Sequence, residues 1–198
     1  MRRFLSLAFA CTLATFTGFA HAQQQIDIAV GGAELYSPKP TNASEAFPPP
    51  SERGGIYASV SAQVLFENHY GLSAESSWRY NKGLYNGFQS VRPMFTDVNG
   101  VFTHHLRNRL DADFAGGVGI ETVIFYDEFS RCAFGSCPQS LTSNHFMMHL
   151  GAGFRYRVFR RFFVRPEANY YYVISNSEFH SGNVLRLGAS FGYTFGHK

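Results

Sequence analysis

The sequence contains little lysine, and after its first residues it has no long apolar run. Of its 17 basic residues only Lys39, Lys82 and Lys198 are lysines, whereas the surface of a soluble protein usually carries more of them. No stretch after residue 22 stays apolar over the roughly 18 residues that a transmembrane helix requires. If the mature chain crosses a membrane, it must therefore do so with strands.

A large excess of one charge is also lacking. Residues 1–22 contain two of the 17 basic residues and none of the 14 acidic ones, so the remainder is nearly neutral. Proteins that bind nucleic acids usually present a basic patch. We therefore expect no nucleic-acid partner.

The N-terminal segment has the three parts of a secretory signal peptide. Met1-Arg2-Arg3 is basic, residues 4–19 are mostly apolar, and Ala20-His21-Ala22 is a small-x-small cleavage site. We predict cleavage after Ala22, which leaves residues 23–198 as a single domain. A membrane anchor is the alternative, although the apolar run is short and interrupted by threonines.

The C-terminal residues 183–196 alternate between two faces, as a strand does. One face is apolar and ends in aromatic residues: Leu185, Leu187, Ala189, Phe191, Tyr193 and Phe195. The other is polar and mostly small: Arg186, Gly188, Ser190, Gly192 and Thr194. The same period predicts seven further strands, at 25–36, 55–66, 70–80, 88–103, 110–126, 145–156 and 162–173.

Two places disturb this alternation. Gly31-Gly32 blurs it in the first strand and marks a candidate bulge. In the fourth strand Arg92 falls on the apolar face, which indicates either a bulge at Pro93 or a position of Arg92 above the membrane.

Long and short connections alternate along the chain. The long segments follow the first, third, fifth and seventh strands, at 37–54, 81–87, 127–144 and 174–182. The connections after the second, fourth and sixth strands are short, so the short turns and both termini fall at one end. An even strand number with short turns at one end and long loops at the other is typical of outer-membrane barrels.

On these features the chain resembles the small outer-membrane barrels of the OmpA and OmpX type. The resemblance covers residues 25–196 and includes the signal peptide, the alternating strands, the Phe163-Val164-Arg165-Pro166-Glu167 strand and the aromatic final strand. It implies an all-β fold, an eight-stranded antiparallel transmembrane up-and-down β-barrel, in the outer membrane of a Gram-negative-type bacterium. The chain departs from these proteins where Gly196-His197-Lys198 follow Phe195.

A soluble lipocalin-like barrel is the rival fold, because its strands also have one apolar and one polar face. There the polar face meets water and should be rich in Lys, Glu and Thr. Here it carries glycines such as Gly117, Gly119, Gly151 and Gly153 between a few charges. Small residues leave room for large charged partners in a narrow lumen, which favours the membrane barrel.

The polar face carries charged residues that we predict to lie in the lumen: Glu75, Arg79, Asp97, Asp111, Asp113, Glu121, Arg155, Arg165, Glu167 and Arg186. Charges in a low-dielectric enclosure persist only when paired, and arginine suits bidentate pairing with carboxylates. We therefore expect a charge-plugged lumen rather than a transport site. Facing arginines also lower the pKa that a general acid needs, which argues against acid–base catalysis.

The distance of each residue from the ends of its strand gives its depth in the barrel, and these depths make the prediction more specific. Arg155 should pair with Asp113 or Asp111 on the adjacent strand near the periplasmic end, with Arg165 offsetting the extra negative charge. A second cluster, nearer the middle of the membrane, should contain Glu75, Glu167 and Arg186.

Three other patterns are candidates for chemistry. His180-Ser181 invites comparison with lipid A deacylases, but those enzymes carry His-x-Ser-Asn on a strand. The adjacent His104-His105 point apart and have no third ligand, so we expect no metal site. Cys132 and Cys137 are the two cysteines left after processing; export favours a disulfide between them, with metal binding as the alternative.

The predicted function is that of a structural or surface-interaction barrel without enzymatic activity or a cofactor. A passive channel for small solutes or hydrophobic compounds is the first alternative, and a lipid-modifying enzyme is the second. The expected partners are outer-membrane lipid and lipopolysaccharide, the barrel-insertion machinery, and an extracellular partner bound through loops 37–54 and 127–144.

Overall fold

The computed structural model of the protein describes residues 24–39, 50–66, 69–126 and 140–196. The predicted signal peptide and the predicted Cys132–Cys137 disulfide lie outside these residues. The described part of the chain is all β. Its strands are β1 (Gln24–Tyr36), β2 (Ile56–Phe66), β3 (Tyr70–Arg79), β4 (Gly83–Tyr85), β5 (Gln89–Arg107), β6 (Leu110–Tyr126), β7 (Ser140–Arg157), β8 (Phe162–Val173) and β9 (Asn183–Phe195).

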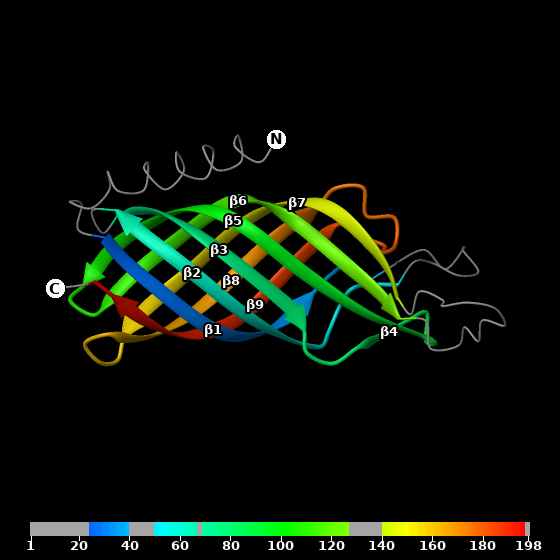
Figure 1. Ribbon diagram of the computed structural model, residues 1–198, viewed down its shortest axis with the longest axis horizontal. Helices are drawn as coiled ribbons and strands as arrows, with labels where there is room; N and C mark the ends of the chain where they lie inside the picture. The colour runs from blue at the N-terminus through cyan, green and yellow to red at the C-terminus, as the bar shows by residue number, and fades with distance from the viewer. Residues whose placement is uncertain (1–23, 40–49, 67–68, 127–139, 197–198) are drawn as a thin grey trace, which may run out of the picture.

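Eight of these strands close a barrel (Figure 1). Neighbours pair antiparallel in the order β3-β2-β1-β9-β8-β7-β6-β5, and β5 pairs with β3 to complete the ring. The short strand β4 pairs with β5 alone, beyond the end of β3. The predicted eight-stranded antiparallel barrel is therefore confirmed, and β4 is an additional strand inside the segment 81–87 that was expected to be a loop.

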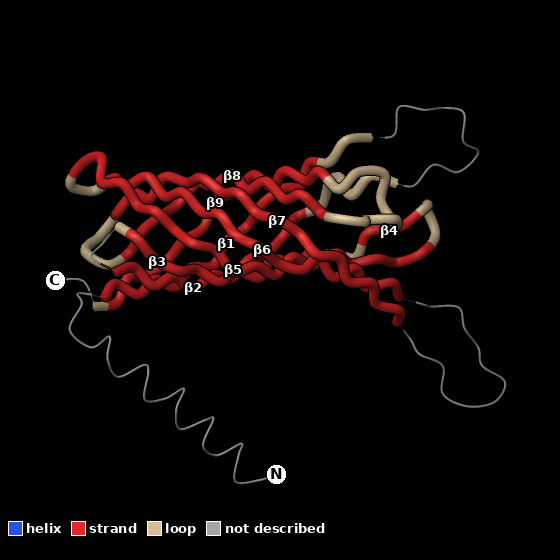
Figure 2. Tube along the Cα trace, turned by 90° about the horizontal axis from the view of Figure 1, so that it is seen from above, coloured by secondary structure: helices blue, strands red, loops and turns tan. Residues whose placement is uncertain are grey.

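The two ends of the barrel differ. At one end tight connections join β2 to β3, β5 to β6 and β7 to β8, and β1 begins and β9 ends there (Figure 1). The longer connections gather at the opposite end, as the tan segments of Figure 2 show. We call these the short-turn end and the loop end.

The backbone ladders are more regular than the sequence indicated. The register of β1 with both neighbours runs through Gly31-Gly32 without a shift, so the candidate bulge there is wrong. The pairing of β5 with β6 is also continuous past Pro93, and Arg92 lies on the outer face near the loop end. The irregularity in that ladder falls between His105 and Arg107, next to the short turn.

Two strands are longer than the alternation predicted. β5 continues to Arg107 instead of ending at residue 103, and β7 begins at Ser140 instead of residue 145. Both extensions lie at the ends of the barrel, where outward-facing positions include polar residues such as His104 and Thr142. A strand that meets water on both faces loses its alternation, so the sequence pattern could not mark where it ends.

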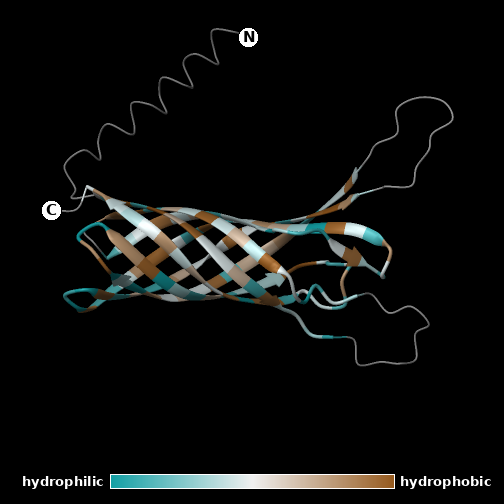
Figure 3. Cartoon of the chain, turned by 90° about the horizontal axis from the view of Figure 1, so that it is seen from below, coloured by the Kyte–Doolittle hydropathy of each residue, from teal (hydrophilic) through white to brown (hydrophobic). Residues whose placement is uncertain are grey.

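The outer face of the barrel is an apolar belt. Val30, Leu72, Val98, Val118 and Leu150 point outward and are between 49% and 65% exposed. Figure 3 shows hydrophobic and hydrophilic residues alternating along the strands. Soluble monomers rarely expose apolar surface on this scale, whereas the lipid-facing band of a membrane barrel has this composition.

Aromatic residues lie at both edges of the belt. At the short-turn end the ring centroids of Tyr70 and Phe102 are 5.3 Å apart, and those of Phe162 and Phe191 are 5.6 Å apart. Toward the loop end Tyr172 is 48% exposed. Aromatic girdles of this kind flank the apolar band of outer-membrane barrels. The described residues include no helix with the length and apolarity needed to span a bilayer.

Candidate functional site

The candidate site is the lumen of the barrel. All the charged residues predicted for it lie on the inner face of their strands, at positions that alternate with the outer apolar ones. Arg155, Arg186, Asp111 and Glu121 have no exposed surface, whereas Arg79 is half-buried. The structure divides these residues into separate groups at different depths.

One group near the short-turn end surrounds Arg155 on β7. Its Nη1 atom lies 2.8 Å from Asp27 Oδ2 on β1, and its Nη2 atom lies 2.8 Å from Asp113 Oδ2 on β6. Thr103 on β5 donates a hydrogen bond of 2.8 Å to Asp113. The ring of Phe163 on β8 lies 5.0 Å from the guanidinium carbon. Side chains from five strands thus meet in the lumen at this depth.

Asp111 belongs to a different group, nearer the rim. It pairs with Arg157 Nη2 at 2.6 Å and with His105 Nδ1 at 2.6 Å. Asp111 is the direct backbone partner of Arg155, yet the Arg155 side chain leans away to Asp113 and Asp27 instead. Of the two acids predicted for Arg155, the structure therefore places Asp113 there and not Asp111.

A second group lies deeper in the barrel, around Arg186 on β9. Arg186 donates a hydrogen bond to Glu75 on β3 and another, of 3.4 Å, to Glu167 on β8. Arg165 Nε donates to Glu167 at 3.0 Å, and its terminal nitrogens each lie 3.3 Å from an acceptor on β2, Gln63 Oε1 and Ser61 Oγ. Arg165 thus pairs with Glu167 and lines one cavity together with Asp113, and its predicted role of offsetting charge in the Arg155 group stays a prediction.

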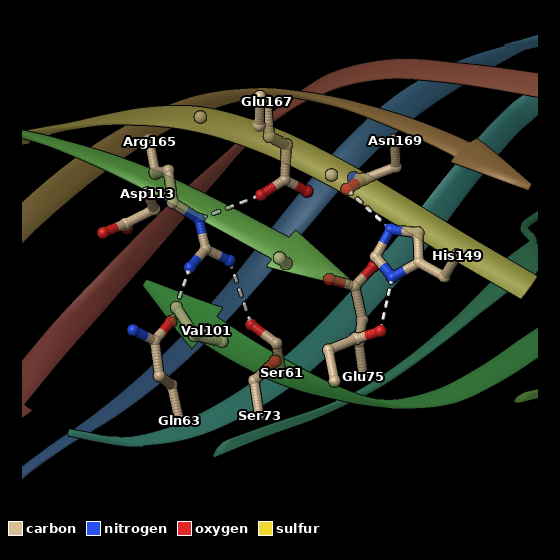
Figure 4. A pocket seen from close by; sticks show the side chains of 15 residues that line it. Ser61, Gln63, Ser73, Glu75, Val101, Asp113, His149, Arg165, Glu167 and Asn169 are labelled. Carbon is tan, nitrogen blue, oxygen red and sulfur yellow. Dashed lines mark hydrogen bonds and ion pairs between the residues drawn. The ribbon is translucent and has the colours of Figure 1, made fainter. Parts of the chain in front are cut away.

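His149 on β7 hydrogen-bonds to two polar side chains (Figure 4). Its Nδ1 lies 2.7 Å from Asn99 Oδ1, and its Nε2 lies 3.0 Å from Asn169 Oδ1. Asn99 donates its amide to Asp97, which turns its oxygen toward the imidazole. Asp97, Asn99, His149 and Asn169 therefore form one continuous chain of polar side chains.

A polar cavity lies between the His149 and Arg165 side chains (Figure 4). The centres of water molecules have about 40 Å³ of room in it, which is enough for a few waters. Its lining includes Glu75, Glu167 and Asn169, so waters inside would find several hydrogen-bond partners. The cavity is a polar pocket with room for water and is too small to serve as a pore by itself.

An aromatic layer lies in the lumen between this cavity and the loop end. The rings of Tyr171 and His149 stack at 4.8 Å, Tyr171 and Phe95 stack at 5.1 Å, and Phe95 lies 6.0 Å from Tyr57. Tyr57, Phe95 and Tyr171 have no exposed surface. Further apolar side chains complete this cluster: Leu35, Met147, Val173 and Val184.

The described parts of two long connections, residues 50–55 and 174–182, fold over the mouth at the loop end. His180 N donates a hydrogen bond of 3.1 Å to Pro50 O, which joins the two segments. Phe179 is buried against an apolar cluster of strand and hairpin residues: Tyr85, Val91, Val123 and Phe125. These two segments therefore cover part of the mouth of the barrel.

Two carboxyl groups meet beneath this cover. Glu52 is 2% exposed and lies against Glu121, which also accepts a hydrogen bond of 3.1 Å from Asn176. Burial, and then the neighbouring Glu121, raise the pKa of Glu52 well above its ordinary value, while Arg79 opposes the shift. Among the residues that the structure describes, no other N–H or O–H group donates a hydrogen bond to either oxygen of Glu52. The two carboxyls can hydrogen-bond only by sharing a proton.

Arg79, predicted for the lumen, lies at this mouth and not with the deeper groups. Its guanidinium passes over Gly55 and Gly83, where a Cβ on either residue would overlap it. Gly55 also has a positive φ of 90°, which favours glycine. These two glycines therefore make the space that Arg79 occupies.

Sequence reasoning missed several residues of the lumen. Asp27 and His149 lie at sequence positions that alternate with the apolar ones, as lumen residues should. Alternation, however, indicates only the face on which a residue lies and not its partner across the barrel. Glu52 lies in a proline-rich segment that had no strand pattern. Tyr57 and Tyr171 fell on the polar face of their strands. Two large aromatic residues on that face were the available sequence signal for an aromatic layer, and the structure buries both.

The residues considered for catalysis and metal binding make other contacts. Ser181 Oγ accepts hydrogen bonds from the backbone and side-chain nitrogens of Asn183, at 3.1 and 3.3 Å. His105 turns inward to Asp111, whereas His104 is exposed on the outer face. Within the described part of the chain no group of three or more His, Cys, Asp and Glu residues is placed to hold a metal ion.

No protein-family model matches the chain, and no curated protein matches it in sequence. The N-terminal β-barrel domain of Pseudomonas aeruginosa OprF matches it in structure with a TM-score of 0.60 and 11% identity, over 88% of this chain and 100% of that one. Neisserial surface protein A matches with a TM-score of 0.60 and 9% identity, over 88% and 98% of the two chains.

A third similar structure is Ail, the attachment invasion locus protein of Yersinia pestis, in complex with the heparin analogue sucrose octasulfate. Its TM-score is 0.51 at 14% identity, over 87% of this chain and 97% of that one. The chain therefore has the fold of the small eight-stranded outer-membrane barrels. At this level of identity the likeness concerns the fold.

Proposed function

We propose that the protein is a structural or surface-interaction barrel of the outer membrane in a Gram-negative-type bacterium, with a lumen closed to solutes. The observation that supports a closed lumen is the presence of buried inward side chains at two depths. The Arg155 group lies near the short-turn end, and the layer of Tyr57, Phe95 and Tyr171 lies toward the loop end.

The apolar belt with its aromatic edges supports membrane insertion. By analogy with other barrels, the short-turn end faces the periplasm and the loop end faces outward, after export through a cleaved signal peptide. Membrane fractionation tests this part of the proposal. The protein should extract from outer membranes only with detergent and should migrate faster on SDS gels unboiled than boiled; a freely soluble monomer would refute it.

Two observations support a role in surface interaction. Several apolar side chains at the loop end are highly exposed, namely Ile56, Tyr80, Leu84 and Phe88, at 65% to 69%. Two similar structures are Neisserial surface protein A and the attachment invasion locus protein. We propose that loops 37–54 and 127–144 supplement this surface for an extracellular partner. Lipopolysaccharide and the barrel-insertion machinery are the partners that any such barrel would meet.

The polar cavity beside His149 favours a passive channel for small solutes as the second candidate. Swelling of liposomes in isotonic arabinose separates the two functions. A closed barrel leaves the swelling rate at that of protein-free liposomes, whereas a channel raises it. A lipid-modifying activity would appear as a mass change of lipid A in cells that express the protein, and we expect none.

A further inference from the structure

The short-turn end carries a basic rim. Arg107 and Arg109 lie at the turn between β5 and β6, and Arg160 and Arg161 lie in the turn between β7 and β8; all four are exposed. The two turns touch, because Arg157 N donates a backbone hydrogen bond of 2.8 Å to Arg109 O. The exposed arginines therefore belong to one continuous surface.

The acidic side chains described at this end do not neutralise the positive charge of the four exposed arginines. At the described positions of the short-turn end the acids are Asp27, Asp111 and Asp113, and each is at most 6% exposed. They pair inward with Arg155 and Arg157. The four outer arginines thus keep their positive field, which attracts an anion from outside the protein.

An open groove runs from this rim onto the outer wall of the barrel. It is lined by Arg160 and Arg161 together with three aromatic residues: Phe159, Phe162 and Tyr193. Phe159 is 71% exposed at the tip of the turn. Arg161 Nη1 donates a hydrogen bond of 3.1 Å to Tyr193 Oη, which holds its guanidinium at the edge of the groove.

The aromatic wall of the groove is part of the apolar belt. Phe162 lies with its ring 5.6 Å from Phe191 and 5.0 Å from Tyr193, on the outer face. The groove thus has cations at one end and an apolar wall that continues toward the centre of the belt at the other. A soluble anion would use only the first, whereas a phospholipid matches both.

We propose that this groove binds an anionic glycerophospholipid, with its phosphate on Arg160 and Arg161 and its acyl chains along Phe159, Phe162 and Tyr193. Guanidinium groups match phosphate oxygens with two parallel hydrogen bonds. Aromatic side chains favour the boundary between headgroups and acyl chains. The inference rests on the proposed function, which places the short-turn end at the inner leaflet of the outer membrane.

Native mass spectrometry of the full barrel in neutral detergent tests the proposal. Phosphatidylglycerol and phosphatidylcholine with the same acyl chains are added in equal amounts, and retained lipid is compared. We expect the barrel to retain phosphatidylglycerol in preference. An Arg160→Gln/Arg161→Gln variant should lose this preference by roughly 25-fold, since each of the two cations contributes about fivefold in affinity for an anionic headgroup.

The matched control is Lys39→Gln/Arg53→Gln, which removes two exposed cations at the loop end and should leave the preference unchanged. A Phe159→Ser variant should weaken retention of both lipids, because it removes an acyl-chain contact. Soluble glycerol 3-phosphate in millimolar excess should not displace the lipid. If glycerol 3-phosphate did displace the lipid, the groove would recognise phosphate without any contribution from the acyl chains, and the proposal would be overturned.

Equal retention of the two lipids by the unmodified barrel, or an equal loss in the two double variants, would also overturn it. A slower migration of the boiled sample on SDS gels first shows that each variant is folded. A barrel that folds in detergent but shows no headgroup preference contradicts only this inference. A chain that never forms a detergent-stable barrel contradicts the proposed function itself.

Discussion

Arg155 on β7 and Asp27 on β1 form an ion pair of 2.8 Å, although β8 and β9 separate their strands around the wall. The pair therefore crosses the lumen and does not follow the sheet. With Asp113 on the other guanidinium nitrogen, it links opposite sides of the barrel by side-chain contacts that add to the backbone ladders. Because Arg155 has no exposed surface, its partners do not have bulk water in its place if Arg155 is removed.

Replacing Arg155 with Ala should destabilise the folded barrel by about 3 kcal/mol, because two buried carboxylates lose their cation. The loss should be smaller at acidic pH, where the orphaned acids can take up protons. Urea unfolding in lipid vesicles, followed by gel shift at pH 5 and pH 8, measures both effects. Arg53→Ala, at an exposed position, is the control and should leave the unfolding midpoint unchanged. An Arg155→Ala barrel with the same midpoint as the parent at both pH values would rule out the ion-pair layer.

Gly192 on β9 makes room for the ring that packs on Arg155. A Cβ at this position would overlap the ring of Phe163, which lies 5.0 Å from the Arg155 guanidinium carbon. Gly192→Ala should therefore cost roughly 1–3 kcal/mol through overpacking. Gly32→Ala is the matched control, because its Cβ would meet nothing within 4 Å. Equal unfolding midpoints for the two variants would show that the Phe163 ring has space to move and does not define the layer.

The docking of residues 50–55 should weaken as the pH rises. The folded protein raises the pKa of Glu52, so the protonated carboxyl favours the docked state. Its contribution is fully present below the ordinary carboxyl pKa of about 4.3 and is lost as the pH rises through the higher, folded value. The charged groups that face it are Glu121 and Arg79, with Tyr57 beside them.

Hydrogen exchange at Gly54 reports on this docking, because Gly54 N donates to Leu35 O at 2.9 Å. After correction for the intrinsic rate, its protection should fall between acidic and neutral pH. Glu52→Gln mimics the protonated acid and should remove this dependence, whereas Glu34→Gln, at an exposed position, should preserve it. Persistence of the dependence in Glu52→Gln would assign the effect to another group.

The predicted disulfide between Cys132 and Cys137 lies outside the described residues and stays a prediction. We expect a maleimide reagent to leave the untreated, exported protein unlabelled and to label two thiols after reduction. So small a loop contributes only roughly 2 kcal/mol in the chain-entropy picture. A Cys132→Ser/Cys137→Ser barrel should therefore still fold, and labelling of the untreated protein would disprove the bond.

The sequence predicted on which face of its strand each residue lies, but it did not predict which residues pair across the lumen. The alternation placed Glu75, Arg186 and Glu167 on one side of the sheet, because a strand has a fixed period of two. It could not find Asp27 as the partner of Arg155, since that contact depends on how the sheet closes and staggers. Likewise, Glu52 reaches the mouth through a segment without any regular period.

The central claim is that the lumen is closed by two independent layers, and single-channel recording in planar bilayers tests it most directly. The unmodified protein should insert without stepwise conductance. A variant with only the upper layer opened, Phe95→Ser/Tyr171→Ser, should also stay silent, because the Arg155 group still fills the lumen below. Adding Arg155→Ser and Phe163→Ser should open both layers and give discrete steps, which confirms that the assay detects this barrel. Regular conductance steps from the unmodified protein would contradict the account.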